Sequence, residues 1–199
     1  YCATYVPSEF KQLLKCSSHL TFNSLSQWNT WSKQALKSKK CKHFGLRVNP
    51  GYSEIETALY DPASEQSRLG IPRNKFGDQL PEGINGLHFH ALCENNSFTL
   101  EKVLDSFSAL YDPFIKQVEW VNMGGGHLMT KEGYDILHLI QVLKAFKEKY
   151  PNLKEIILEP GSAVGWQTGV LKSTVLDIVD NGGKTTAMLD VSFTCHMPD

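Results

Sequence analysis

The sequence predicts an α/β protein: a parallel (β/α) barrel of the eight-stranded type, followed by the beginning of a β-rich domain. Short apolar or β-branched runs alternate with segments of helical period, as in sheets whose parallel strands are joined by crossover helices. Reactive side chains stand where the expected strands end, and we expect none where a strand begins. Barrels gather their active sites at these strand ends. A doubly wound open sheet, the alternative fold, gathers its ligand groups at one switch point.

Six runs of the chain are expected to be strands, so that six of the eight strands of a barrel would be present. These runs are YCATYV (1–6), HLTFNSL (19–25), FGLRVN (44–49), INGLHFHAL (84–92), VEWVNM (118–123) and EIILEPG (155–161). A capping-box spacing at Ser24 and Gln27 begins one helix. Apolar faces predict two more, through Leu100, Leu104, Phe107 and Leu110 and through Ile136, Ile140, Leu143 and Phe146. The polar loop over 49–82 is too long for a simple connection and is expected to be functional.

The pattern of residue types changes after Gly169, where β-branched runs replace the alternation of strands and helices. Two β-branched runs flank Asn181-Gly182-Gly183, which is a β-hairpin signal. We therefore expect two domains, a partial barrel over 1–169 and the beginning of a β-rich domain over 170–199.

The composition excludes several classes of partner. The chain has 199 residues and a formal net charge of -1, which argues against nucleic acid or an anionic membrane surface as the main partner. No apolar stretch approaches the length of a membrane span. The five cysteines are scattered and form no CxxC pair, so we expect reduced thiols in the cytoplasm and no bound metal.

The run VEWVNMGGGH ends one of the expected strands in Gly124, Gly125 and Gly126. Three glycines cost backbone entropy, and they allow several backbone N–H groups to point into one concavity, which suits a phosphate. A plain flexible turn is the alternative, because the run lacks the spacing of the known nucleotide-binding loops.

The run LEPGSAVGW ends another expected strand. Glu159 follows three apolar residues and precedes a Pro-Gly turn, so its carboxylate is expected at the mouth of the barrel; a loop or helix-capping carboxylate is the alternative. Gly161 and Ser162 offer N–H and hydroxyl donors to a second side of the same phosphate.

Two histidines alternate along the run GLHFHAL, so that His88 and His90 share one face of the strand. His90, at the strand end, is placed to lie against an aromatic ligand, whereas His88 is expected to be a hydrogen-bonded core residue. Arg47 lies inside an apolar strand and needs a partner, structural or catalytic. Together these groups indicate a flat, aromatic, phosphorylated cofactor, and pyridoxal 5'-phosphate fits that description.

Several strings resemble those of a known family. HFHAL, NMGGGH, LEPGSAVGW, LDVSFTCHMPD and LRVNPGYSEIETALYDPASEQSRLG are similar to the carboxynorspermidine/carboxyspermidine decarboxylase family. These polyamine enzymes depend on pyridoxal phosphate and fall in the alanine-racemase-like group, with ornithine and diaminopimelate decarboxylases. The resemblance covers essentially the whole chain. The GGG and EPG motifs are shared across the group, while the other strings are more specific.

The resemblance implies a role for each matching residue. It implies that His90 stacks on the pyridine ring, that the three glycines with Gly161 and Ser162 hold the phosphate, and that Arg47 lies near the cofactor. Glu159 matches the acid that pairs with the pyridine nitrogen, and it is expected at the substrate site as well. Because such a carboxylate keeps the ring protonated, the ring becomes a strong electron sink. Racemases of the group use an arginine there, so Glu159 favours a decarboxylase.

The resemblance also implies parts that this chain lacks. The lysine that binds the cofactor covalently is expected upstream of Tyr1, and Lys75 stands in a different context. A catalytic cysteine and an aspartate, supplied across a homodimer interface in the group, are expected beyond Asp199; Cys195 is not in that motif. We therefore expect an incomplete copy of the enzyme that is inactive alone.

The substrate expected from the resemblance is a carboxylated polyamine, and its cationic tail requires anionic or carbonyl partners. Asp199, with His196 as its neighbour, is the candidate, and a solvated turn aspartate is the alternative. Three other readings of the chain remain open. They are a non-catalytic pyridoxal-phosphate carrier barrel, a diaminopimelate- or ornithine-type decarboxylase, and a (β/α) binding protein without this cofactor.

Overall fold

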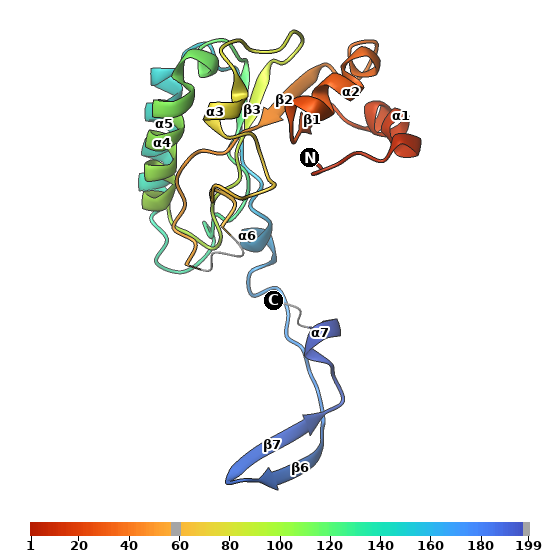
Figure 1. Cartoon of the computed structure of the whole chain (residues 1–199). Helices are drawn as coiled ribbons and strands as arrows, with labels where there is room; N and C mark the ends of the chain where they lie inside the picture. The colour runs from red at the N-terminus through yellow and green to blue at the C-terminus, as the bar shows by residue number, and fades with distance from the viewer. Residues whose placement is uncertain (57–60, 197–199) are drawn as a thin grey trace. The chain divides into compact units, whose positions relative to one another are not determined.

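The structure is a computed structural model that describes residues 1–56 and 61–196. The chain divides into two compact units, Tyr1–Trp166 and Gln167–Asp199. The first unit alternates strands and helices along its length (Figure 1). The predicted α/β class is confirmed.

A five-stranded parallel sheet forms the centre of the first unit. Its strands follow one another in space in the order of the sequence. They are β1 (His19–Phe22), β2 (His43–Arg47), β3 (Gly86–His88), β4 (Trp120–Asn122) and β5 (Glu155–Ile157). Because every crossover advances by one strand in the same direction, the sheet has no switch point. This order is that of a barrel sheet and not of a doubly wound sheet.

The sheet is strongly curved. β1 and β5 are its two outer strands, and a flat sheet would hold them roughly 19 Å apart. The imidazole of His19 in β1 nevertheless lies 3.1 Å from the carboxylate of Glu155 in β5, and its ring stacks on that of His43 at 4.3 Å. These three residues open their strands, so the expectation that no reactive side chain stands at a strand start was wrong.

The number of strands also differs from the prediction, which was six. Residues 1–6 form no strand. Pro7 lies in the first turn of helix α1 (Pro7–Cys16), where the missing N–H of proline costs nothing. The run contacts the sheet through Tyr5 instead of pairing with it: Tyr5 is buried against Phe22, and its hydroxyl donates to the carbonyl of Thr21 at 2.6 Å.

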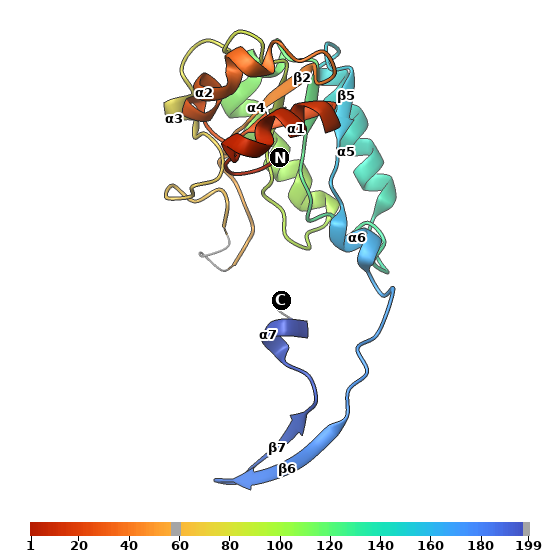
Figure 2. The ribbon, with the colours of Figure 1, turned by 90° about the vertical axis from the view of Figure 1, so that its right-hand side faces the viewer.

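The helices of the first unit are α1, α2 (Leu25–Ala35), α3 (Arg73–Phe76), α4 (Ser97–Ile115), α5 (Ile136–Lys149) and α6 (Gly161–Gly165). In the described part of the chain, four of them lie between successive strands of the sheet, while α1 precedes β1 and α6 follows β5. Figure 2 shows α1 and α2 near each other, and the rings of Phe10 and Trp31 stack between them at 4.2 Å. The predicted cap of α2 is confirmed, since the Ser24 hydroxyl accepts the N–H of Gln27.

The helices α4 and α5 lie side by side (Figure 1). The predicted face of α4 is buried at Leu100, Leu104 and Phe107. In α5, however, the buried residues are Leu139, Val142 and Phe146, whereas Ile136 and Ile140 are more than 40% exposed. The apolar residues of α5 can form either the predicted face or the observed one, which share Phe146. The contact with α4 buries the observed face.

Trp120 fills the inside of the curved sheet. Its indole is 1% exposed and lies over Gly45 of β2 and Gly86 of β3. A Cβ atom added at Gly45 would lie 2.4 Å from the indole, and one at Gly86 would lie 1.9 Å from it. The indole N–H donates to the side chain of Asn85 at 3.1 Å. Glycine is therefore required at both positions, because the indole occupies the space that a side chain would need.

We expect Gly86→Ala to lower the free energy of unfolding by about 1–3 kcal/mol, the usual cost of overpacking a core. Urea titration followed by circular dichroism measures the change. Gly161→Ala is the matched control, because a Cβ atom there meets nothing within 4 Å. Equal stability of the two variants would contradict this account of the core.

The second unit is a β-hairpin followed by a short helix. Its elements are β6 (Val175–Asn181), β7 (Lys184–Leu189) and α7 (Phe193–His196). The strands pair antiparallel around Gly182 and Gly183, both with positive φ, as the two-residue turn of a hairpin requires. The predicted hairpin is confirmed. Among all helices in the described ranges, none has the length and apolarity needed to cross a membrane.

Candidate active site

A row of buried polar side chains crosses the sheet at the ends of three neighbouring strands. Arg47, His88 and Asn122 are the last residues of β2, β3 and β4, and they lie side by side in register. They are 5%, 0% and 7% exposed. Buried polar groups need partners, so this row marks the carboxyl end of the sheet as the polar end of the unit.

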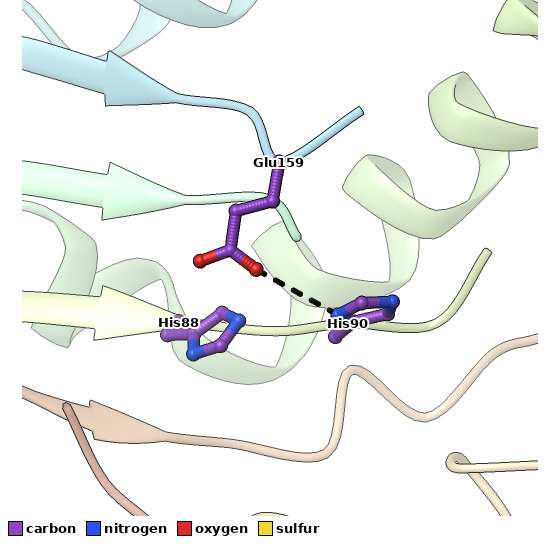
Figure 3. A group of neighbouring side chains, drawn as sticks. All are labelled: His88, His90 and Glu159. Carbon is purple, nitrogen blue, oxygen red and sulfur yellow. Dashed lines mark ion pairs between the residues drawn. The ribbon is translucent and has the colours of Figure 1, made fainter. Parts of the chain in front are cut away.

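Glu159 and His90 lie just beyond this row. Each follows its strand by two residues, and Figure 3 shows the Glu159 side chain extending from its own segment toward His90, which lies beside His88. The backbone N–H of Glu159 donates to the carbonyl of Gly124 at 2.8 Å, which continues the contact between neighbouring chain segments past the strand ends. The structure thus brings together the predicted acid, the predicted stacking histidine and the glycine turn.

The ring of His90 is neutral at ordinary pH. Burial lowers the pKa of His90, the nearby Arg47 guanidinium lowers it further, and the Glu159 carboxylate opposes both. The 3.9 Å between His90 Nδ1 and Glu159 Oε2 is too long for a hydrogen bond. Nδ1 instead accepts the N–H of Gly125 at 3.5 Å. His90, with 39% of its side chain exposed, therefore presents an uncharged flat ring.

His88 lies beside His90 and is fully buried. Within residues 1–56 and 61–196, neither of its ring nitrogens has a hydrogen-bond partner, so the expected hydrogen-bonded core histidine is not found. Burial holds the pKa of His88 well below its usual value, and the charges of Arg47 and His90 act in the same direction. The side chain is accordingly a neutral polar group facing the site.

We expect acid to destabilise this unit. Because the folded pKa of His88 lies below its unfolded value of about 6.5, the unfolded chain binds more protons in the window below that value. Stability is therefore full above about pH 6.5 and falls as the pH drops toward the folded pKa. Urea titrations between about pH 7.5 and pH 5 measure the slope, and His88→Asn should flatten it relative to a control variant of the exposed His196. An unchanged slope in His88→Asn would contradict the assignment.

The glycine turn is built for close contact between chain segments. Gly124 and Gly126 have positive φ, and added Cβ atoms would lie 2.7 Å from His90 Cγ at Gly124, 2.6 Å from the Glu159 carbonyl at Gly125, and 2.1 Å from the Leu92 carbonyl at Gly126. The N–H of Gly124 donates to Asn122 Oδ1 at 2.8 Å. Two of the three N–H groups thus have internal partners, and a phosphate role for the turn stays a prediction.

The other predicted site residues take different positions. Gly161 and Ser162 are exposed at the start of α6, directly after Glu159 and Pro160. Arg47 finds its partners in the backbone carbonyl of His90, at 3.3 Å, and in the ring of Tyr1, at 4.7 Å.

The two predicted contacts for the substrate tail belong to the second unit. His196 ends α7, and its Nδ1 accepts the N–H of Ser192 at 3.0 Å. Asp199 lies outside the described residues.

A cavity of about 500 Å³ opens within the first unit, between the pair His90 and Glu159 and the long loop. This volume is within the range of small-molecule sites. The cavity is lined by Tyr1, Arg47, Ile55, Pro62, Leu69, His90, Leu92, Cys93 and Glu159. The long loop therefore contributes to the site, as its length indicated.

Glu54 anchors the loop to helix α4. Its carboxylate accepts hydrogen bonds from Thr99 Oγ1 and Lys102 Nζ, both at 2.6 Å, and from Tyr52 Oη at 2.8 Å. The hydrogen bonds from Lys102, Thr99 and Tyr52 lower the pKa of Glu54 to about 2. The loop segment just after Asn49 is thus held against the body of the unit.

A metal ion is a weak candidate for the ligand. His88, His90 and Glu159 have ligand atoms within 4.8 Å of one another, whereas two ligands of one tetrahedral zinc, bound at about 2.0 Å, lie roughly 3.3 Å apart. The buried Arg47 also adds positive charge beside the cluster. The arrangement suits an organic ligand better.

Sequence reasoning missed Asn122. Its amide donates to Glu159 Oε1 at 2.8 Å and accepts the N–H of Gly124 at 2.8 Å, so it joins two predicted parts of the site. The available signal was one polar residue that closes an apolar strand two positions before the first glycine.

Comparisons with known proteins agree on one kind of relative. No protein-family model matches the sequence. The chain is 46% identical over its whole length to a carboxyaminopropylagmatine decarboxylase of Synechocystis and covers 51% of that protein. It is 42% identical to a carboxynorspermidine/carboxyspermidine decarboxylase of Campylobacter jejuni and covers 50% of it. The chain thus spans about half the length of these relatives.

Solved structures give the same picture. The crystal structure of a Campylobacter jejuni carboxynorspermidine decarboxylase complexed with norspermidine matches 99% of this chain with a TM-score of 0.83 and 41% identity, over 49% of its own length. A diaminopimelate decarboxylase matches with a TM-score of 0.76 at 18% identity, which bears on the fold alone. In sequence and in fold, over its whole length, this chain resembles the carboxynorspermidine and carboxyaminopropylagmatine decarboxylases.

Proposed function

We propose that this chain takes part in the decarboxylation of a carboxylated polyamine, with pyridoxal 5'-phosphate as cofactor. The observation that carries the proposal is the pairing of a neutral, half-exposed His90 ring with the Glu159 carboxylate at the edge of a cavity of about 500 Å³. A flat aromatic ring needs one face to lie against and one polar partner at its edge. These two side chains offer both.

The residues present fit this cofactor. His90 would lie against the ring, and Glu159 Oε2 faces the site while Oε1 is held by Asn122. Gly125 leaves no room for a side chain, and together with Gly124, Gly126, Gly161 and Ser162 it is our candidate for the phosphate side. Arg47 would hold its charge close to the cofactor.

The chemistry divides between the cofactor and the protein. When bound, pyridoxal phosphate supplies an electron sink for the carbanion that forms as carbon dioxide leaves. Glu159 would hold a proton on the ring nitrogen through a charge-assisted hydrogen bond. His90 and the loop anchored by Glu54 would exclude water from one face of the site.

The substrate is proposed to be carboxynorspermidine, carboxyspermidine or carboxyaminopropylagmatine. All three would present an amino-acid head to the cofactor and a cationic tail to the protein. We propose that Glu159 lies at the head, and that Asp199 and His196 recognise the tail, because amines that lose water need anionic partners.

Asp199→Asn should therefore raise the activation free energy that kcat/KM reports by about 1.5–3 kcal/mol, the scale of a hydrogen bond to a charged group. The affinity for pyridoxal phosphate should not change. Steady-state kinetics in an active preparation and a cofactor titration measure the two effects. A loss of activity that follows a loss of cofactor would remove Asp199 from the substrate site.

A homodimer with its active sites at the interface and a cytoplasmic location are further parts of the proposal. The location rests on the five cysteines, all of which are free thiols, as expected in a reducing compartment.

The proposal is tested by two measurements on one preparation. Absorbance in the near-ultraviolet and visible range follows the binding of pyridoxal phosphate, and release of carbon dioxide follows turnover with each of the three substrates. In a preparation that also supplies the lysine and the cysteine expected outside residues 1–199, saturable binding with turnover of at least one substrate is expected. Binding without turnover would favour the non-catalytic carrier, and no binding would overturn the proposal.

Borohydride reduction adds a separate prediction. The cavity lining includes no lysine within the described ranges, so we expect no single lysine of residues 1–199 to be labelled stoichiometrically by pyridoxal phosphate and borohydride. Peptide mapping by mass spectrometry gives the answer. A uniquely labelled lysine in this chain would show that the site is built differently from our account.

A further inference from the structure

Asn122 lies where the predicted parts of the site meet. It closes β4, and its side chain reaches both the glycine turn and Glu159. It is 7% exposed, so its amide cannot rely on bulk water and must find its partners inside the protein.

The chemistry of the two partners fixes the orientation of the amide. The N–H of Gly124 can only donate, so the oxygen of Asn122 must face the turn. The NH2 group then faces Glu159 Oε1 at 2.8 Å and requires an acceptor. A carboxylate oxygen is such an acceptor, so the orientation imposed by the turn directs the NH2 group of Asn122 to Glu159.

The Glu159 side chain needs such a restraint. It stands on the segment beyond β5, and 41% of it is exposed. A long flexible side chain in that position samples several rotamers unless a bond selects one. Its other neighbours do not supply that bond: His90 Nδ1 is 3.9 Å away, and in the described part of the chain His88 makes no side-chain hydrogen bond.

We propose that Asn122 is the positioning residue of this site. It holds the Glu159 carboxylate by Oε1, leaves Oε2 free for a ligand, and ties the carboxylate to the glycine turn through one amide. The functional part of this inference rests on the proposed function, in which Glu159 meets the cofactor ring. The hydrogen-bond part rests on the protein alone.

The hydrogen bond is tested without cofactor. We expect Glu159→Ala to speed the solvent exchange of the Asn122 side-chain amide, followed by nuclear magnetic resonance, by roughly ten-fold or more. The control is the amide of Asn152, which donates to the carbonyls of Ile115 and Val118 and should not change. Because Glu159 is half-exposed, this variant leaves the core intact. Unchanged exchange at Asn122 would overturn the inference.

The functional part is tested by cofactor affinity. Asn122→Asp keeps the acceptor for Gly124 but removes the donor to Glu159 and sets a second carboxylate beside it. We expect the Kd for pyridoxal phosphate to rise by about ten- to a hundred-fold, and the double variant Asn122→Asp with Glu159→Ala to bind no worse than Glu159→Ala alone, because the two residues act as one unit.

The outcomes separate the two claims. Additive losses in the double variant would show that Asn122 acts independently of Glu159 and would overturn the positioning role. If the unchanged protein binds no pyridoxal phosphate, the proposed function fails, while amide exchange still decides whether Asn122 holds Glu159. Asn152→Asp is the matched control for an amide that is lost elsewhere in the same unit.

Discussion

Replacing Glu159 by glutamine should lower the rate of decarboxylation by roughly 10²-fold or more, the scale on which loss of one preorganised electrostatic partner acts. Glutamine keeps the length of the side chain and an oxygen that can accept the hydrogen bond from the Asn122 amide, but it removes the charge. Because the charge stabilises a proton on the cofactor ring in our proposal, kcat should fall much more than cofactor affinity. Single-turnover kinetics and a cofactor titration measure the two quantities.

Glu155→Gln is the control for this substitution. Glu155 is the first residue of β5, the strand that Glu159 follows; it pairs with His19 at 3.1 Å and is 52% exposed. It is therefore a carboxylate beside a histidine at the opposite end of β5. Its replacement should leave kcat within about two-fold, because exposed pairs of this kind contribute little. Full activity of Glu159→Gln, or an equal loss in both variants, would contradict the proposed role.

Gly125→Asp should abolish measurable binding of pyridoxal phosphate, the second large effect that we expect. The new Cβ would lie 2.6 Å from the Glu159 carbonyl, which displaces the segment that carries the acid. The added carboxylate would also repel the cofactor phosphate. Absorbance titration measures the affinity, and circular dichroism verifies that the variant is folded.

Two further variants separate space from charge. Gly125→Ala adds the Cβ alone and should weaken binding less than Gly125→Asp does. Gly169→Asp adds the same charge where a Cβ meets nothing within 4 Å, and it should bind normally. If folded Gly125→Asp binds as tightly as the unchanged protein, the glycines serve only to let chain segments approach.

Local patterns were enough to predict the type of fold and several of its details. Alternation of apolar runs and helical periods predicted the parallel sheet. The spacing of Ser24 and Gln27 predicted the helix cap and the glycine pair predicted the hairpin, because both depend on residues close in sequence. The first six residues were wrongly predicted to be a strand, since their composition fits one. Only contact with distant residues such as Phe22 shows that Tyr5 packs on the sheet.

The sequence pointed to His90 and Glu159 as candidate site residues but not to the residues that support them. His90 and Glu159 stand at the ends of strands, which sequence reveals, and the structure brings them together. The bond from Asn122 to Glu159 joins residues 37 positions apart, and the pair of His19 and Glu155 depends on the curvature of the whole sheet. The close contacts of the glycine turn likewise depend on how β3 and β5 continue past their ends.

The packing of Trp120 over Gly45 and Gly86 has an evolutionary consequence. Its indole occupies the space that side chains at positions 45 and 86 would fill, so the three positions share one volume. Homologous proteins should therefore change them together, with a larger residue at position 45 or 86 only where position 120 holds a smaller one. A single substitution at any of the three positions would give a less stable protein. These three positions should therefore be among the slowest-evolving in the sheet.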